Sequence, residues 1–121
     1  MANEITLSTR LKRVKNGRTA ERGTLGLSVD ASGDQYQGGI QTIGTSEEAL
    51  ILGDVAAGGY CWIKNLDSTN FVSFRSGTGA TDFMELLPGE EACFRLSRSA
   101  TAPYAIADTA AVDIEVLLFD A

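Results

Sequence analysis

The 121-residue chain contains no histidine. Histidine is the commonest general base and a frequent metal ligand, so its absence disfavours most hydrolase mechanisms and most zinc sites. A serine or cysteine nucleophile would need an unusual base such as lysine. The sequence therefore predicts no catalytic residue, no bound metal and no cofactor, and we expect a protein that is not an enzyme.

Cysteine and long apolar runs are also scarce. The two cysteines, Cys61 and Cys93, do not have the spacing of a paired metal-ligand set, and we expect both to be reduced and partly buried. No apolar run approaches the roughly 18 residues that a membrane-spanning helix needs. Residues 1–20 are too polar and basic for a signal peptide. We therefore expect a protein that is made in the cytoplasm and has no membrane partner.

Positive charge is in the minority, and it gathers at the start of the chain. The 10 Lys and Arg residues face 16 Asp and Glu residues, which gives a net charge of -6. Residues 1–22 hold six basic and two acidic side chains, a net charge of +4, whereas residues 23–121 hold four basic and fourteen acidic ones, a net charge of -10. The acidic total argues against nucleic acid as a partner. The basic segment is either a solvated strand on its own domain or an arm that lies across an acidic neighbour.

The N-terminal segment reads as a β-hairpin. Residues 4–14 are rich in β-branched and long side chains, and the Asn16-Gly17 pair is the one that type I′ turns prefer. The return strand covers about residues 18–30, where Leu25, Leu27 and Val29 alternate on one face. The sequence therefore predicts a hairpin ahead of the main body.

Short strands separated by turn residues continue to the end of the chain. A strand is expected around Ile40 and Ile43, and residues 48–52 form either a short strand or a single helical turn. The clearest strands are Tyr60–Leu66, Phe71–Arg75, Asp82–Leu87, Ala92–Leu96, Tyr104–Ala107 and Val112–Phe119. This spacing, without long helical periods, predicts an all-β, antiparallel, jelly-roll-like β-sandwich. We expect a basic arm or hairpin at residues 1–35 and a sandwich domain at 36–121.

Alternation within the strands predicts which residues are buried. Trp62 lies in step with Tyr60 and Lys64, and a core anchor or a plug at the strand end is favoured over an exposed ligand platform for its ring. The firmest core prediction is the last strand, where four apolar residues share one face: Val112, Ile114, Val116 and Leu118.

Two segments carry a resemblance to a known family: GYCWIKNLDSTNFV at residues 59–72 and LPGEEA at residues 87–92. Together they resemble small β-sandwich virion proteins of tailed bacteriophages, in which a strand, an Asn-Leu-Asp-x-Thr-Asn turn and a returning strand precede a Pro-Gly-Glu turn. Asn65, Asp67 and Asn70 are expected to cap the first turn through side-chain hydrogen bonds, with Leu66 plugging the end of the sandwich.

The resemblance implies a capsid decoration (cement) protein, or a related head or tail accessory protein. Such a protein would be a homo-oligomer, most simply a trimer, on the capsid surface of the virion, with the major capsid protein as partner. Linked weak contacts would hold capsid subunits together. The candidate contact residues lie in the basic arm: Arg10, Lys12, Arg13, Lys15 and Arg18. The alternative is a glycan-binding β-sandwich module, with Trp62, Tyr60 or Tyr36 as stacking platform, or a tail or fibre accessory protein.

Overall fold

Ten strands are present in the computed structural model, which describes residues 3–53, 55, 59–97 and 102–120. No helix among these residues is long and apolar enough to cross a membrane. The strands are β1 (Ile5–Lys15), β2 (Arg18–Val29), β3 (Tyr36–Ile43), β4 (Glu48–Ala49), β5 (Tyr60–Asn65), β6 (Val72–Arg75), β7 (Asp82–Leu86), β8 (Glu91–Arg95), β9 (Tyr104–Ala107) and β10 (Val112–Phe119).

Strands β1 and β2 form the predicted hairpin. Asn16 and Gly17 have φ angles of 52° and 73°, and a type I′ turn requires positive φ at both central residues. The turn brings Lys15 directly opposite Arg18, and antiparallel pairing continues back to Ile5 opposite Val29. The hairpin prediction is therefore confirmed.

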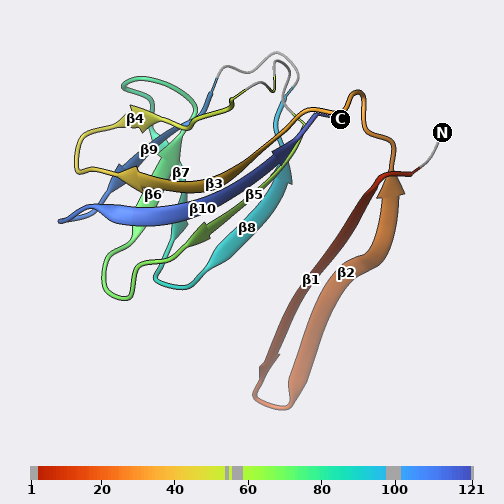
Figure 1. The fold of residues 1–121 in the computed structure, drawn as a ribbon. Helices are drawn as coiled ribbons and strands as arrows, with labels where there is room; N and C mark the ends of the chain where they lie inside the picture. Colours follow the sequence, from red (N-terminus) through yellow and green to blue (C-terminus); the bar gives the residue numbers. More distant parts are fainter. Residues whose placement is uncertain (1–2, 54, 56–58, 98–101, 121) are drawn as a thin grey trace.

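The other eight strands form two four-stranded antiparallel sheets, with the orders β3-β10-β5-β8 and β4-β9-β6-β7. Their buried apolar residues belong to one common core, so the sheets pack face to face as a sandwich (Figure 1). The predicted all-β antiparallel sandwich is confirmed. The pairing within the sandwich is nested: β3, its first strand, pairs with β10, its eighth, and β5, its third, pairs with β8, its sixth. This order agrees with a jelly roll, which stays a prediction. The domain division at residue 35 also stays a prediction.

The core consists of the inward residues of both sheets. Val112, Ile114, Val116 and Leu118 are 0 to 6% exposed, as the alternation of β10 predicts. Phe74 of β6 meets them from the opposite sheet as the largest fully buried side chain. At about 25 cal/mol per Å² of apolar surface, burial on this scale is the main favourable contribution to folding of the sandwich.

Two burial predictions are wrong. Trp62 lies on the outer face of its sheet, because Cys61, Ile63 and Asn65 are the buried residues of β5 and alternate residues face opposite ways. Leu66 is 41% exposed and does not plug the sandwich. At residues 48–52, the two open alternatives resolve as the short strand β4, which pairs with β9.

Asn65 occupies the buried position that Leu66 was expected to fill. Its side chain is fully buried, and Nδ2 donates to the carbonyl oxygens of Asn70 and Leu86, both at 3.0 Å. Its Oδ1 accepts from the Asp67 amide at 2.8 Å. One amide side chain thus forms hydrogen bonds with backbone groups of two separate turns. Its own buried polar atoms also find the partners that buried polar groups need.

Replacing Asn65 with alanine is expected to lower the free energy of unfolding by about 3 kcal/mol, because it leaves buried carbonyl groups without donors. Urea denaturation followed by fluorescence measures this loss. The matched control is Thr109→Ala, which removes an exposed hydrogen bond to Asn70 Oδ1 and should cost less than about 1 kcal/mol. Equal losses in the two variants would contradict the role of Asn65.

Candidate interaction surface

Among the described residues, the base of the β1–β2 hairpin, residues 5–8, lies across a cleft from the sandwich. Ile5 is buried there opposite Val29, and the Asn3 amide donates to Asp30 Oδ1 at 2.9 Å. Every residue from Ser8 to Ser28 is exposed, and Figure 1 shows the hairpin extending away from the two packed sheets. The candidate contact residues therefore lie on a projecting ribbon.

One face of this ribbon is uniformly basic. Residues paired across antiparallel strands share a face, and Leu11 pairs with Arg22 while Arg13 pairs with Ala20. The face that carries Leu11, here called the Leu11 face, spans the paired residues from Thr9 and Thr24 to the turn. It holds four basic side chains and no acidic one: Arg13, Lys15, Arg18 and Arg22.

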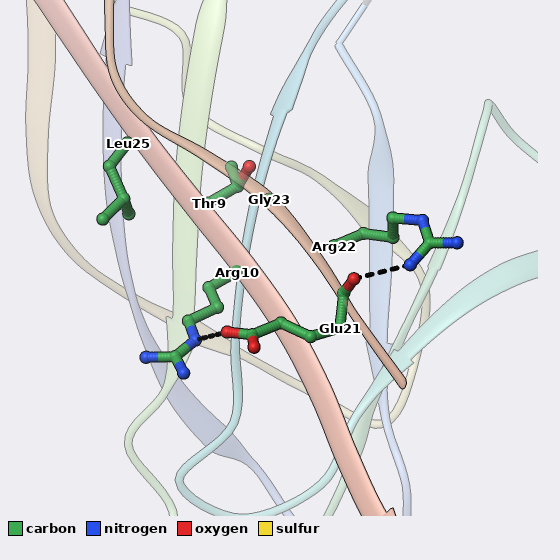
Figure 2. A pocket seen from close by; sticks show the side chains of 6 residues that line it. All are labelled: Thr9, Arg10, Glu21, Arg22, Gly23 and Leu25. Atoms are coloured by element: carbon green, nitrogen blue, oxygen red, sulfur yellow. Dashed lines mark hydrogen bonds and ion pairs between the residues drawn. The ribbon is translucent and has the colours of Figure 1, made fainter. Parts of the chain in front are cut away.

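The opposite face of the ribbon contains its one acidic side chain. Glu21 lies directly opposite Lys12 and forms an ion pair with Arg10 Nε. Arg22 reaches back to donate from Nη1 to the Glu21 carbonyl oxygen at 2.7 Å (Figure 2). The acidic group is therefore engaged on the Arg10 face, and the Leu11 face keeps its positive charge without an acidic counterpart on the ribbon.

The five predicted contact residues are all exposed on this ribbon: Arg10, Lys12, Arg13, Lys15 and Arg18. The structure divides them, with the first two on the Glu21 face and the last three on the Leu11 face. Arg22 joins the second group and was not predicted. The signal that could have found it is the Asn16-Gly17 turn, which fixes the register that places Arg22 opposite Leu11. Their contact with a partner stays a prediction.

A β-bulge interrupts the ribbon near its base. Three residue steps from Leu27 to Thr24 face only two steps on β1, and the extra residue lies at Leu25-Gly26. Gly26 has a φ of 74°, and its amide donates to Ser8 Oγ at 2.9 Å. The predicted alternation of Leu25 with Leu27 is therefore wrong, because the bulge changes the face on which Leu25 lies.

The ribbon also exposes large apolar side chains. Leu11 is 80% exposed and Leu25 75% exposed, and Val14 is exposed on the Arg10 face. An open hollow of about 440 Å³ lies beside Leu25 and the Arg10–Glu21 pair (Figure 2). Leu27 is also exposed, so four large apolar side chains of the ribbon face solvent, distributed over both of its faces.

The outer face of the β3-β10-β5-β8 sheet forms a second candidate surface. The strand register places Leu117, Trp62 and Cys93 side by side across β10, β5 and β8, in what we call the apolar row. The next row along the strands is Glu115, Lys64 and Glu91, called the acidic row. A third acidic side chain, Asp113, follows on β10.

A cleft of about 290 Å³ separates the base of β1 from this sheet face. Its walls include Leu7 of the hairpin and the apolar row of the sheet. Trp62 is half-buried, and its Nε1–H donates to Glu91 Oε1 at 3.4 Å. The Arg95 guanidinium lies 4.6 Å from the centroid of the Tyr60 ring, a cation–π distance.

The two cysteines belong to adjacent strands but face opposite ways. Cys61 is buried in the core, where desolvation, with a smaller effect of Cys93, raises the pKa of its thiol to about 12. Cys93 is exposed on the apolar row and lines the cleft, so the prediction that both are partly buried is wrong. Both are free thiols, as expected. Opposite faces of a sheet keep them from bonding to each other.

The described part of the chain brings together no group of three or more His, Cys, Asp or Glu side chains that could hold a metal ion. Comparison with protein-family models, with curated proteins and with solved structures finds no match for this chain. The ribbon and the outer sheet face are therefore the candidate functional surfaces of the described residues.

In the folded protein, we expect a thiol reagent such as Ellman's reagent to modify one cysteine per chain. Cys93 is exposed to the reagent. Cys61 is buried, and its raised pKa leaves little of the thiolate with which the reagent reacts. The reagent should modify two cysteines after denaturation. The Cys93→Ser variant should show no rapid reaction when folded, and rapid modification of that variant would contradict the assignment.

Proposed function

We propose that this protein is a non-enzymatic structural protein of a phage virion, most simply a capsid decoration protein that holds neighbouring capsid subunits together. The observation that supports this proposal is the projecting ribbon. Its basic and apolar side chains are exposed from Ser8 to Ser28, on a hairpin that lies apart from the two packed sheets in Figure 1. A surface of this kind is suited to adhesion to another polypeptide.

The ribbon needs a partner for its own stability. A two-stranded hairpin is marginally stable at best in water unless a third strand or a packed face supports it. Here β1 and β2 pair only with each other, so both outer edges keep unpaired backbone groups. An edge of this kind can add to a sheet of a neighbouring chain, which supplies backbone hydrogen bonds in addition to side-chain contacts.

Repetition of the contact supplies the strength. In a homo-oligomer, most simply a trimer, each copy contributes one ribbon and one sandwich to the capsid surface. Once one contact with the major capsid protein has formed, the others form at high effective concentration, so modest contacts add up to firm attachment. The protein would be made in the host cytoplasm and assembled onto the completed head.

A second candidate function is supported by one specific observation. Tyr36, Tyr60 and Trp62 belong to β3 and β5 and face outward on the same sheet, together with Glu91 and Arg95. Aromatic faces beside polar groups suit a sugar ring. The Arg95 guanidinium on Tyr60 and the half-buried position of Trp62 reduce the ring surface that a glycan could cover.

Deleting residues 1–30 tests the decoration function. The deletion ends between β2 and β3, so the sandwich strands remain, and we expect a folded protein with at least about 100-fold weaker binding to undecorated heads, because the linked contacts are lost. Co-sedimentation with heads assembled without the protein measures binding, and circular dichroism checks folding.

A matched pair of charge reversals refines the deletion. Arg13→Glu with Arg18→Glu changes the Leu11 face, and Arg10→Glu with Lys12→Glu makes the same net change on the other face. We expect the stronger loss from the first pair. Undiminished co-sedimentation of the deletion variant would refute the adhesive role of the ribbon.

Glycan binding has its own test. If the aromatic face is a sugar site, an array of bacterial surface glycans should give hits that Trp62→Ala abolishes, because stacking on the indole would be lost. Under the decoration function we expect background signals on the array from both the unmodified protein and the Trp62→Ala variant. Reproducible hits that depend on Trp62 would favour the glycan-binding module.

A further inference from the structure

We propose that the Leu11 face of the ribbon in one copy docks on the outer face of the β3-β10-β5-β8 sheet in a second copy, across the apolar and acidic rows. This inference rests on the homo-oligomer in the proposed function and specifies its interface. The partner is another copy of this chain, and the contact joins two different surfaces of the same molecule.

The two surfaces match in chemistry. Leu11 lies between basic side chains, with Arg22 directly opposite it and Arg13 next along the same face. On the sheet, Trp62 and Leu117 of the apolar row lie next to the acidic row. A leucine on the apolar row would place its flanking guanidinium groups over the carboxylates beside that row.

The charges are complementary in sign as well as in position. The Leu11 face carries four basic side chains and no acidic one. Glu115, Glu91 and Asp113 on the sheet face outnumber its two bases, Lys64 and Arg95. Guanidinium–carboxylate pairs can form two parallel hydrogen bonds, so the contact is oriented as well as attractive. Close approach of like charges would disfavour packing of two ribbons against each other.

A copy cannot readily place its own Leu11 on its own apolar row. The ribbon is anchored at Ile5, and six residues of extended strand carry Leu11 about 20 Å from that anchor. Figure 1 shows the hairpin as a separate ribbon beside the sandwich, with its turn beyond the ends of the sheets. In its own copy, Leu7 and the base of β1 face the apolar row across the open cleft of about 290 Å³, and Glu115 and Asp113 are not among the residues that line that cleft.

A trimer built with this contact is a closed ring. A contact between two different surfaces is heterologous, and repeated contacts close into a ring or continue as a filament. A typical stable interface uses roughly 20 to 30 residues on each side. One face of a short ribbon offers fewer residues than that. A ring compensates for this because each copy is held through both its ribbon and its sheet.

The exposed thiol of Cys93 provides a direct test. In the Leu11→Cys variant, mild oxidation by oxygen with copper–phenanthroline should join the new thiol to Cys93 of a second copy, with two electrons and two protons passing to oxygen. The bond forms only if the two Cα atoms come within about 7 Å. We expect covalent dimers and trimers on a non-reducing gel, formed in more than half of the chains.

Two matched controls locate the contact. Val14→Cys places an exposed thiol on the opposite face of the same ribbon and should give few such bonds. Leu11→Cys combined with Cys93→Ser should give none between these positions. Disulfide-bonded monomers in the Leu11→Cys variant, or equal yields from the Leu11 and Val14 positions, would overturn the proposal.

A charge exchange gives a second test that needs no new cysteine. Arg13→Glu with Arg22→Glu should lower the oligomer population at least about tenfold by light scattering, and adding Glu91→Lys with Glu115→Lys should restore it. No restoration in a folded protein would overturn the docking site. Head binding without the Leu11–Cys93 bond would overturn this interface alone, whereas the bond without head binding would overturn the decoration function alone.

Discussion

A two-stranded ribbon has no interior, so its side chains have no core of their own in which to be buried. Its 11- and 12-residue strands pair only with each other, and their side chains are exposed from Ser8 to Ser28. The sandwich satisfies its own core with the other eight strands, so it does not need the ribbon for burial. The ribbon is therefore costly to keep ordered in a single copy, and a partner that covers one of its faces offsets that cost.

The fold was largely predictable because its strongest signals are local. The alternation of Val112 to Leu118 and the Asn16-Gly17 turn each depend on a few neighbouring residues, and both predictions are confirmed. The failures involve information from distant strands. The predicted capping role of Asn65 is confirmed, but its second acceptor, the Leu86 carbonyl oxygen, belongs to another turn, and nothing in residues 60–66 reveals that partner. The prediction for Trp62 failed because hydrophobicity alone does not say which face of β5 meets the core.

The candidate site was predictable in composition and not in geometry. Counting charges located the basic segment, but the count cannot separate Arg10 from Arg13, which lie on opposite faces. That separation follows from the hairpin register and leaves Glu21 with Arg10. The bulge at Gly26 was also hidden, although a glycine within a strand is a recognised sign of such a break. The sheet surface was missed because its rows combine residues from three strands that are distant in sequence.

Segregated charge within one chain has a physical consequence for assembly. In the proposed oligomer, copies with a basic ribbon and an acidic body would attract each other in a head-to-tail sense, which would steer encounter and select orientation more than it would add affinity. At physiological ionic strength the screening length is about 8 Å, so exposed charges act only near contact. Leu11 of the ribbon and Trp62 of the sheet supply apolar contact that salt does not screen. Charge would then select the partner surface, and the apolar side chains would hold it there.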